Sequence, residues 1–363
     1  LGPLPTPGVS YLANSNNQVG LVISASHNLF EDNGIKFFNK DGQKFSAELE
    51  KRIETKLTQE MVAVESINLG KASRMNDAQG RYIEFCKSSF TDLDLNGLSI
   101  LLDCANGATY SVAPKVFSEL GAKVETIGSS PDGININQNC GSTNPDFLKE
   151  EIIKGSYDLG IAFDGDGDRI LIVNSEGDIL DGDDILYILS NNLTATSGVV
   201  GTLMTNKALE IYFEKNDIPF LRADVGDKYV LQRLLEESWV LGGEPSGHII
   251  CLDSAPTGDA IIAALNLLNA IKDNDFSVKK SLEGFQKFPQ TLINLKVNNP
   301  NKIIVSDKFW SEVTRIEKQL GQNGRVLIRP SGTEPLIRIM VESDKSGASH
   351  DFCNALADLA QTI

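Results

Sequence analysis

Several features that would point to common binding classes are absent from this sequence. It has no run of basic residues, and its 33 lysines and arginines are outnumbered by 49 aspartates and glutamates, for a formal net charge of -16. Nucleic acid and anionic membrane surfaces repel such an acidic chain, so neither is expected to be its main partner. The longest largely apolar stretch, residues 261–268, is far too short to span a bilayer.

Cysteine is also scarce. The cysteines are odd in number, scattered and never spaced as C-x-x-C: Cys86, Cys104, Cys140, Cys251 and Cys353. This pattern disfavours a disulfide framework and predicts reduced thiols in a cytoplasmic protein. The chain begins at Leu1 without methionine, and residues 2–8 have the composition of a loop, so we expect that an N-terminal piece of the first domain is missing.

The most informative stretch is a loop with three aspartates spaced two apart, Asp164–Arg169. The apolar runs on either side of it, residues 159–163 and 170–173, predict two buried strands. The intervening glycines let the backbone turn tightly, so that the three carboxylates converge. Carboxylate oxygens are preferred ligands of hard divalent cations, and the loop is therefore predicted to be a metal site.

Two other interpretations of this loop fit the sequence less well. An EF-hand calcium loop requires glycine at its sixth position and glutamate at its twelfth, where this chain has Arg169 and Ser175. A plain acidic surface turn would leave three closely spaced carboxylates repelling one another. Protein-bound Mg2+ is usually held by few carboxylates together with a phosphate, so a phosphate-binding group is expected elsewhere in the chain.

Four predicted strands end in polar loops that contain glycine or small residues: residues 24–28, 164–169, 243–248 and 329–334. Strands alternate with helical patterns through the middle of the chain, which predicts parallel or mixed sheets covered by helices. In α/β sheets, ligands bind beyond the carboxyl ends of strands. The four loops therefore suggest four domains that each contribute one wall of a single cleft.

Each loop by itself leaves two interpretations open. Ser26 is a candidate nucleophile or an ordinary turn residue. Residues 329–333 form either an anion-binding nest or a simple turn, with Arg338 on the next strand as a second cation. Lys36 is a proton carrier if its surroundings lower its pKa, and otherwise a surface lysine.

Together these loops resemble those of the α-D-phosphohexomutase superfamily, and most of all the bacterial phosphoglucosamine mutases. The matching segments occur in the family's order and cover nearly the whole chain: residues 23–28, 32–38, 103–108, 140–143, 164–169, 243–248 and 329–334. The chain departs from the family's usual residues at Leu29, Asn144 and Lys228.

The resemblance implies a multidomain α/β fold, with three related α/β domains and a smaller C-terminal α+β domain around a central cleft. The expected domains are residues 1–80 with the serine loop, 81–178 with the metal loop, 179–290 with the sugar-binding loop and 291–363 with the phosphate-binding loop.

The resemblance also implies roles for individual residues. Ser26, Lys36 and Arg169 would be catalytic, and one Mg2+ would be held by phosphorylated Ser26 with Asp164, Asp166 and Asp168. The residues expected to bind substrate are Glu244, Ser246, His248, Arg329, Ser331, Gly332, Thr333 and Arg338.

The activity implied is the interconversion of glucosamine 6-phosphate and glucosamine 1-phosphate through a hexosamine 1,6-bisphosphate, which would feed UDP-N-acetylglucosamine and cell-wall precursor synthesis. Alternatives are a sister mutase acting on mannose, glucose or N-acetylglucosamine phosphates, and a non-catalytic protein that binds sugar phosphates. The expected partners are small sugar phosphates, and a homodimer is left open.

Overall fold

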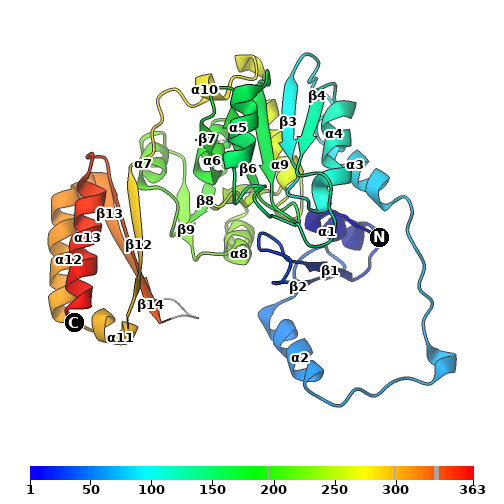
Figure 1. Cartoon of the computed structure of the whole chain (residues 1–363), viewed down its shortest axis with the longest axis horizontal. Helices are drawn as coiled ribbons and strands as arrows, with labels where there is room; N and C mark the ends of the chain where they lie inside the picture. Colours follow the sequence, from blue (N-terminus) through cyan, green and yellow to red (C-terminus); the bar gives the residue numbers. More distant parts are fainter. Residues whose placement is uncertain (195, 298, 331–334) are drawn as a thin grey trace. The chain divides into compact units, whose positions relative to one another are not determined.

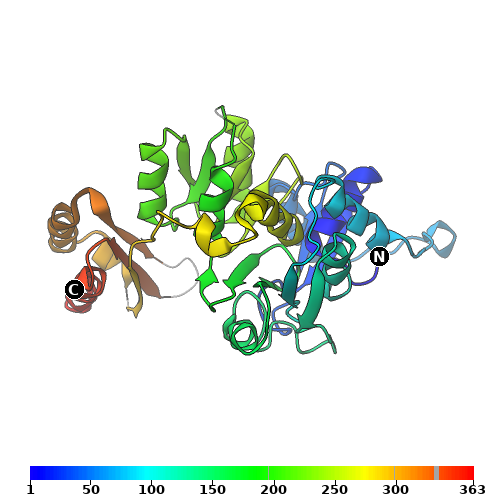
Figure 2. The same cartoon turned by 90° about the horizontal axis from the view of Figure 1, so that it is seen from above.

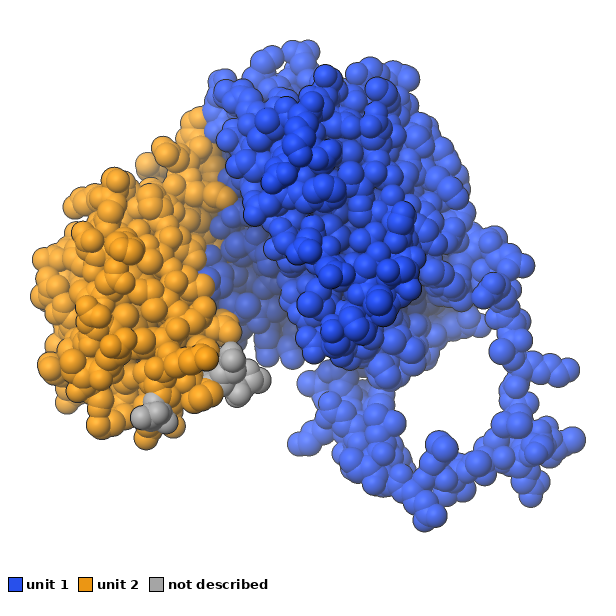
Figure 3. Space-filling view, in the orientation of Figure 1, with its two compact units in different colours: residues 1–204, 219–283 blue, residues 205–218, 284–363 orange. Residues whose placement is uncertain are grey.

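A computed structural model describes residues 1–194, 196–297, 299–330 and 335–363. Residue contacts divide the chain into two compact units, which Figure 3 shows in different colours. Unit 1 comprises Leu1–Met204 and Pro219–Glu283, and unit 2 comprises Thr205–Ile218 and Gly284–Ile363. The four domain ranges expected from the sequence remain predictions, because this division distinguishes only two units.

Unit 1 begins with the helix α1 (Thr6–Ser15), which packs on an antiparallel pair of strands, β1 (Gly20–Ser24) and β2 (Gly34–Phe38) (Figure 1). The prediction of a loop over residues 2–8 is therefore wrong from Thr6 onward. Proline in the first turn suits a helix start, and Val9, Leu12 and Ala13 of α1 are buried. By contrast, α2 (Ala47–Leu57) has no buried residue.

A five-stranded sheet in unit 1 carries the aspartate loop. Its strand order is β4-β3-β5-β6-β7, in which β3, β4 and β5 are parallel, and β6 pairs antiparallel with both β5 and β7. Every residue of β5 is buried, as its uninterrupted apolar sequence predicts. The strands of this sheet and the helices around it are α3 (Ala78–Ser88), β3 (Ser99–Asp103), α4 (Ala113–Glu119), β4 (Lys123–Ile127), α5 (Asp146–Lys154), β5 (Leu159–Phe163), β6 (Ile170–Asn174) and β7 (Ile179–Leu180).

A four-stranded sheet, ordered β11-β10-β8-β9, follows in unit 1. Strands β8, β9 and β10 are parallel, and β11 turns back on β10 as a hairpin. The helix α9 is buried along most of its length, because it contacts both β11 of this sheet and β6 of the five-stranded sheet. The elements are α6 (Gly182–Ser190), β8 (Val199–Thr202), β9 (Phe220–Ala223), α8 (Asp227–Glu237), β10 (Leu241–Gly243), β11 (Ile249–Cys251), α9 (Ala260–Ile271) and α10 (Val278–Ser281).

Unit 2 is built on an antiparallel sheet in the order β12-β14-β13, with α12 and α13 packed side by side on one face (Figure 1 and Figure 2). The core between the helices and the sheet includes Phe309, Ile316, Ile339 and Leu356. The elements are α7 (Lys207–Lys215), β12 (Gln290–Lys296), α11 (Pro300–Ile304), α12 (Asp307–Leu320), β13 (Gly324–Pro330), β14 (Leu336–Ser343) and α13 (Ala348–Gln361).

Two expectations about the whole chain bear on its class. All five cysteines are buried free thiols, as their scattered spacing predicts. Over the described ranges, no helix has the length and apolar character that crossing a membrane requires.

Candidate active site

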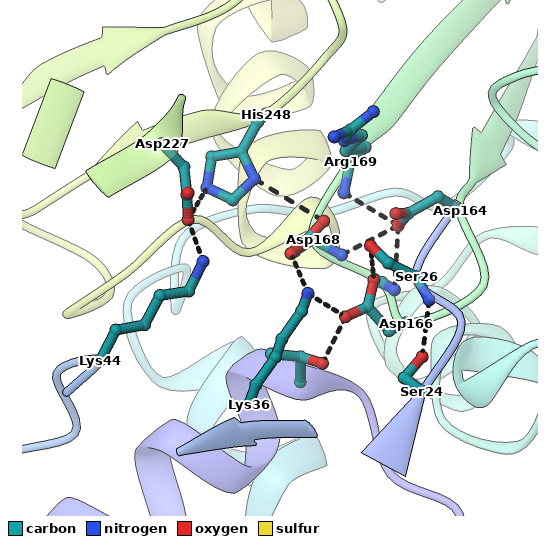
Figure 4. Close-up of polar contacts among 12 residues, drawn as sticks. Ser24, Ser26, Lys36, Lys44, Asp164, Asp166, Asp168, Arg169, Asp227 and His248 are labelled. Atoms are coloured by element: carbon teal, nitrogen blue, oxygen red, sulfur yellow. Dashed lines mark hydrogen bonds and ion pairs between the residues drawn. The ribbon is translucent and has the colours of Figure 1, made fainter. Parts of the chain in front are cut away.

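The three aspartates converge, as their spacing predicts. One carboxylate oxygen from each of Asp164, Asp166 and Asp168 lies within 4.8 Å of the other two, and all three residues are buried. Asp164 also shapes the loop, because its Oδ1 accepts three backbone N–H bonds at 3.0 Å, from Gly167, Asp168 and Arg169. Figure 4 shows the carboxylates turned toward a common centre.

The electrostatics of this cluster favour a bound cation. Burial, together with the charges of Asp168 and Asp166, raises the pKa of Asp164 well above its usual range. Oδ2 of Asp164 and Oδ1 of Asp168 are buried and have no hydrogen-bond partner among the described residues. Oxygen-rich donor sets of this kind suit hard divalent cations, so the three aspartates fit a metal site.

Ser26 lies directly beside this cluster. It follows β1, and its hydroxyl donates to Oδ1 of Asp166 at 2.9 Å (Figure 4). The neighbouring Ser24 instead accepts the backbone N–H of Ser26 on its own hydroxyl at 2.9 Å. Both serines are half-buried. The direction of the side chain, rather than burial, distinguishes Ser26.

The serine loop and the aspartate loop approach each other closely at Gly165. A side-chain Cβ at this position would lie 2.5 Å from the backbone carbonyl oxygen of Ser26. Because that distance is below van der Waals contact, only glycine fits here. The glycine between the first two aspartates therefore lets the Ser26 backbone lie against the metal loop.

Lys36 reaches the same carboxylates from β2. Its Nζ lies 2.5 Å from Oδ2 of Asp166 and 3.1 Å from Oδ2 of Asp168. Burial by itself would lower the pKa of Lys36, but the charges of Asp168 and Asp166 outweigh it and raise that pKa above its ordinary value. The lowered pKa that a proton carrier requires is thus not found in this arrangement, and the geometry favours a fixed positive charge beside the serine.

His248 lies between two carboxylates. Its Nδ1 is 3.6 Å from Oδ1 of Asp168, and its Nε2 is 3.7 Å from Oδ2 of Asp227, which also pairs with Lys44 (Figure 4). Burial opposes the effect, but His248 and the lysines hold the pKa of Asp168 well below its usual range. His248 is itself buried, in contact with the metal loop.

The predicted sugar-binding residues Glu244, Ser246 and His248 lie in the tight turn of the β10–β11 hairpin. In it, the N–H of Glu244 donates to the carbonyl of His248, and that of Gly247 to the carbonyl of Glu244. Ser246 is exposed, whereas Glu244 is buried and its Oε1 accepts the N–H of Gly226 at 2.8 Å.

Arg169 follows the last aspartate and is half-buried. Its backbone N–H donates to Asp164, whereas its Nε is buried without a hydrogen-bond partner among the described residues. An unpaired buried guanidinium nitrogen is costly, which suits a group that binds a ligand anion.

In unit 2, Arg329 and Arg338 face each other across the β13–β14 pair. Like charges directly opposite on neighbouring strands are unfavourable. Among the described residues, neither guanidinium has a carboxylate partner, so the pair suits an anionic ligand. Ser331, Gly332 and Thr333, which were predicted to complete this site, lie outside the described residues.

The structure adds residues that the sequence did not indicate. Thr6, at the start of α1, donates its hydroxyl to Oδ2 of Asp166 at 2.6 Å and its N–H to the carbonyl of Asp166 at 2.8 Å. Lys44 and Asp227 form the ion pair behind His248. The only local signals were a proline on each side of Thr6 and a glycine before Asp227.

Comparison with known proteins agrees with this architecture. Four family models match in order: phosphoglucomutase/phosphomannomutase alpha/beta/alpha domains I, II and III over residues 1–63, 80–177 and 181–288, and the C-terminal domain over residues 292–359. The chain belongs to the phosphoglucomutase/phosphomannomutase family.

Within that family, the chain is similar to phosphoglucosamine mutases. It is 50% identical to the one from Legionella pneumophila (strain Corby), over 99% of this chain and 80% of that protein. It is 48% identical to the one from Pseudomonas aeruginosa (strain UCBPP-PA14), over 100% of this chain and 83% of that protein.

Solved structures share the fold at low sequence identity. A phosphoglucomutase/phosphomannomutase family protein from Burkholderia thailandensis matches with a TM-score of 0.78 and 21% identity, over 99% of this chain and 82% of that one. Aspergillus fumigatus N-acetylphosphoglucosamine mutase, solved with GlcNAc-6P and magnesium, matches with a TM-score of 0.74 and 17% identity, over 98% and 92% of the two chains.

Proposed function

We propose that this protein is a phosphohexomutase that interconverts glucosamine 6-phosphate and glucosamine 1-phosphate, and that Ser26 carries the phosphoryl group. The observation that carries this proposal is the hydrogen bond from the Ser26 hydroxyl to Asp166, inside the three-aspartate cluster. The high identity to phosphoglucosamine mutases supports the choice of glucosamine as the sugar.

The reaction consists of two phosphoryl transfers. In the first, the bond between phosphorus and Oγ of Ser26 breaks as a bond to O1 of glucosamine 6-phosphate forms, and the O1 proton passes to Oγ of Ser26. The resulting 1,6-bisphosphate turns over, its 6-phosphoryl group returns to Oγ of Ser26, and the proton that Oγ releases passes to O6. The product is glucosamine 1-phosphate, and the serine is phosphorylated again, so no net phosphate donor is consumed.

The residues around Ser26 supply charge and position. Uncatalysed phosphate-monoester chemistry is so slow that accelerations of up to ~10^21 are known, so several groups have to act together. Mg2+ bound by Asp164, Asp166 and Asp168 would neutralise charge on the transferring phosphoryl group. Lys36, fixed by Asp166 and Asp168, adds a positive charge beside the same hydroxyl.

Other groups are proposed to hold the sugar and its second phosphate. Ser246 is exposed at the tip of the β10–β11 turn, where its hydroxyl is free to meet a sugar hydroxyl, with Glu244 beside it. The opposed Arg329 and Arg338 are the proposed ligands of the non-reacting phosphate, together with Ser331–Thr333. One phosphate site that serves both substrate orientations allows the same serine to act at O1 and at O6.

A non-catalytic sugar-phosphate-binding protein is the second candidate, and the intact site disfavours it. A protein that only bound its ligand would not need a serine hydroxyl directed at a buried cluster of carboxylates. The two are distinguished by incubating the protein with glucosamine 6-phosphate, Mg2+ and a trace of glucose 1,6-bisphosphate, then recording phosphorus NMR spectra. Formation of glucosamine 1-phosphate is expected. Binding of the sugar phosphate without conversion would favour the second candidate.

A further inference from the structure

Asn137 holds the serine loop from outside the first family domain. It lies in the segment between β4 and α5, and its side-chain Nδ2 donates to the carbonyl oxygen of Ser26 at 2.8 Å and to that of Asn28 at 2.6 Å. Both amide hydrogens are therefore used on one loop. Only 6% of Asn137 is exposed, so water does not readily replace these bonds.

The orientation of this amide is determined by its partners. Rotating it by half a turn would bring Oδ1 against two carbonyl oxygens, with no hydrogen between them. Oδ1 of Asn137 has no hydrogen-bond partner in the described part of the chain, so the side chain is held by the two bonds it donates. Its backbone N–H donates to the carbonyl of Ala105 at 2.8 Å, which ties it to the loop after β3.

The serine loop depends on such support because its backbone is in a sparsely populated conformation. Ser26 has a φ of +53°, which is unfavourable for residues other than glycine and asparagine. Gly165 lies against one side of the Ser26 carbonyl oxygen, and the Asn137 amide binds the same oxygen. These contacts fix the peptide after Ser26 while its hydroxyl is directed at Asp166.

We infer that Asn137 is a positioning residue for phosphoryl transfer, which acts by fixing the Ser26 loop against the aspartate cluster without touching the substrate. This inference rests on the proposed function, in which Ser26 carries the phosphoryl group. A positioning role predicts a loss in turnover rather than in substrate binding, because the proposed phosphate-binding arginines are unaffected.

The test uses two variants that remove the Asn137 amide donors by different chemical changes. Asn137→Asp keeps the size of the side chain but removes both donors and places a carboxylate against two carbonyls. Asn137→Gly removes the amide and still accepts the left-handed backbone, because Asn137 has a φ of +57°. Asn139→Asp is the matched control, since Asn139 lies in the same segment with a φ of +55° and is exposed.

For both Asn137 variants, kcat for glucosamine 6-phosphate should fall by about a hundredfold, the loss expected when a reacting group is misplaced by about 1 Å. The KM should stay within about twofold of wild type, because the interactions that bind the substrate before the reaction are retained. Phosphoryl transfer from glucose 1,6-bisphosphate to Ser26 should slow to the same extent, as measured by mass spectrometry of the intact protein. Asn139→Asp should behave as wild type.

Hydrogen exchange separates positioning from general instability. Exchange should accelerate in the peptide covering residues 24–30 of both Asn137 variants, while β3 and β5 keep wild-type protection. If the wild type is active but both Asn137 variants keep its kcat and its exchange rates, the positioning role is wrong and the proposed function still stands. A wild type that converts no hexose phosphate would remove the proposed function, and the positioning role with it, even if exchange in residues 24–30 still accelerated.

Discussion

The hydroxyl of Ser26 lies 2.9 Å from Oδ1 of Asp166, although 140 positions separate the two residues in the chain. Oδ2 of the same carboxylate accepts hydrogen bonds from the hydroxyl of Thr6 and the ammonium group of Lys36. One aspartate therefore joins the proposed nucleophile, a positive charge and the candidate metal cluster. The consequences of changing either partner can be measured separately.

Asp166→Asn should reduce turnover by about 10²–10³-fold, the loss typical of removing one electrostatic group from a transition state. The amide retains the size of the side chain but weakens the attraction for a cation. Turnover should be measured against Mg2+ concentration, and the half-saturating concentration is expected to rise.

Asp92→Asn is a suitable control, because Asp92 is exposed and the substitution changes the charge equally. It should leave the Mg2+ dependence unchanged. Full activity of the wild-type protein in excess chelator would show that the aspartate cluster does not act through a divalent cation.

Ser26→Ala should abolish mutase activity, because no other hydroxyl donates to Asp166 from the same loop. Ser24→Ala should lower activity less than Ser26→Ala does, since the Ser24 hydroxyl accepts the N–H of Ser26 and does not itself point at Asp166. Tandem mass spectrometry after incubation with glucose 1,6-bisphosphate should locate the phosphate on Ser26. Phosphate found on Ser24 alone would contradict this assignment.

Arg329→Ala and Arg338→Ala should each weaken the affinity for glucosamine 6-phosphate by about tenfold to a hundredfold, the value of one hydrogen bond to a charged group. Titration calorimetry with unphosphorylated glucosamine should show no comparable difference. Arg315→Ala removes an arginine from α12 that pairs with Glu312, and it serves as a control. Equal affinities for all three variants would disprove the phosphate role.

The buried Asp259 predicts a dependence of stability on pH. It caps α9 and accepts the hydroxyl of Tyr82 at 2.9 Å, and burial raises its pKa from 3.8 to about 6. Because the folded state holds this proton more tightly than the unfolded state, the stabilisation is complete below about pH 4 and is lost as pH rises to about 6.

Asp259→Asn should remove that loss, since asparagine keeps a capping oxygen without ionising. The difference in unfolding free energy between variant and wild type should therefore shift in favour of the variant by up to about 3 kcal/mol between pH 4 and pH 7. Urea unfolding at both pH values measures it. A difference that does not change with pH would show that Asp259 stays ionised in the folded protein.

The sequence predicted the parts of the site that are built from local patterns. The converging aspartates followed from their spacing, and strand β5 from its apolar run. Ser26 and Lys36 came from family resemblance, and the structure brings both to Asp166. These residues could be predicted because neighbouring residues in the chain determine the conformation of the loops that carry them.

Contacts between distant segments were not predictable in this way. Thr6 was overlooked because proline-rich sequence suggested a loop, whereas its proline neighbours fit the first turn of a helix. Lys44 and Asp227 are 183 positions apart, and no local pattern pairs them. The short strand β11 was missed for a related reason, because its three residues are too few to show a period.

The central claim is that phosphorylated Ser26 converts glucosamine 6-phosphate into glucosamine 1-phosphate. It is tested most directly by measuring kcat/KM of wild-type and Ser26→Ala protein for glucosamine 6-phosphate, mannose 1-phosphate, glucose 1-phosphate and N-acetylglucosamine 6-phosphate, with Mg2+ and glucose 1,6-bisphosphate present. We predict the highest kcat/KM for glucosamine 6-phosphate and no conversion of any substrate by Ser26→Ala. A higher kcat/KM for another sugar would contradict the substrate assignment, and undiminished turnover by Ser26→Ala would contradict the mechanism.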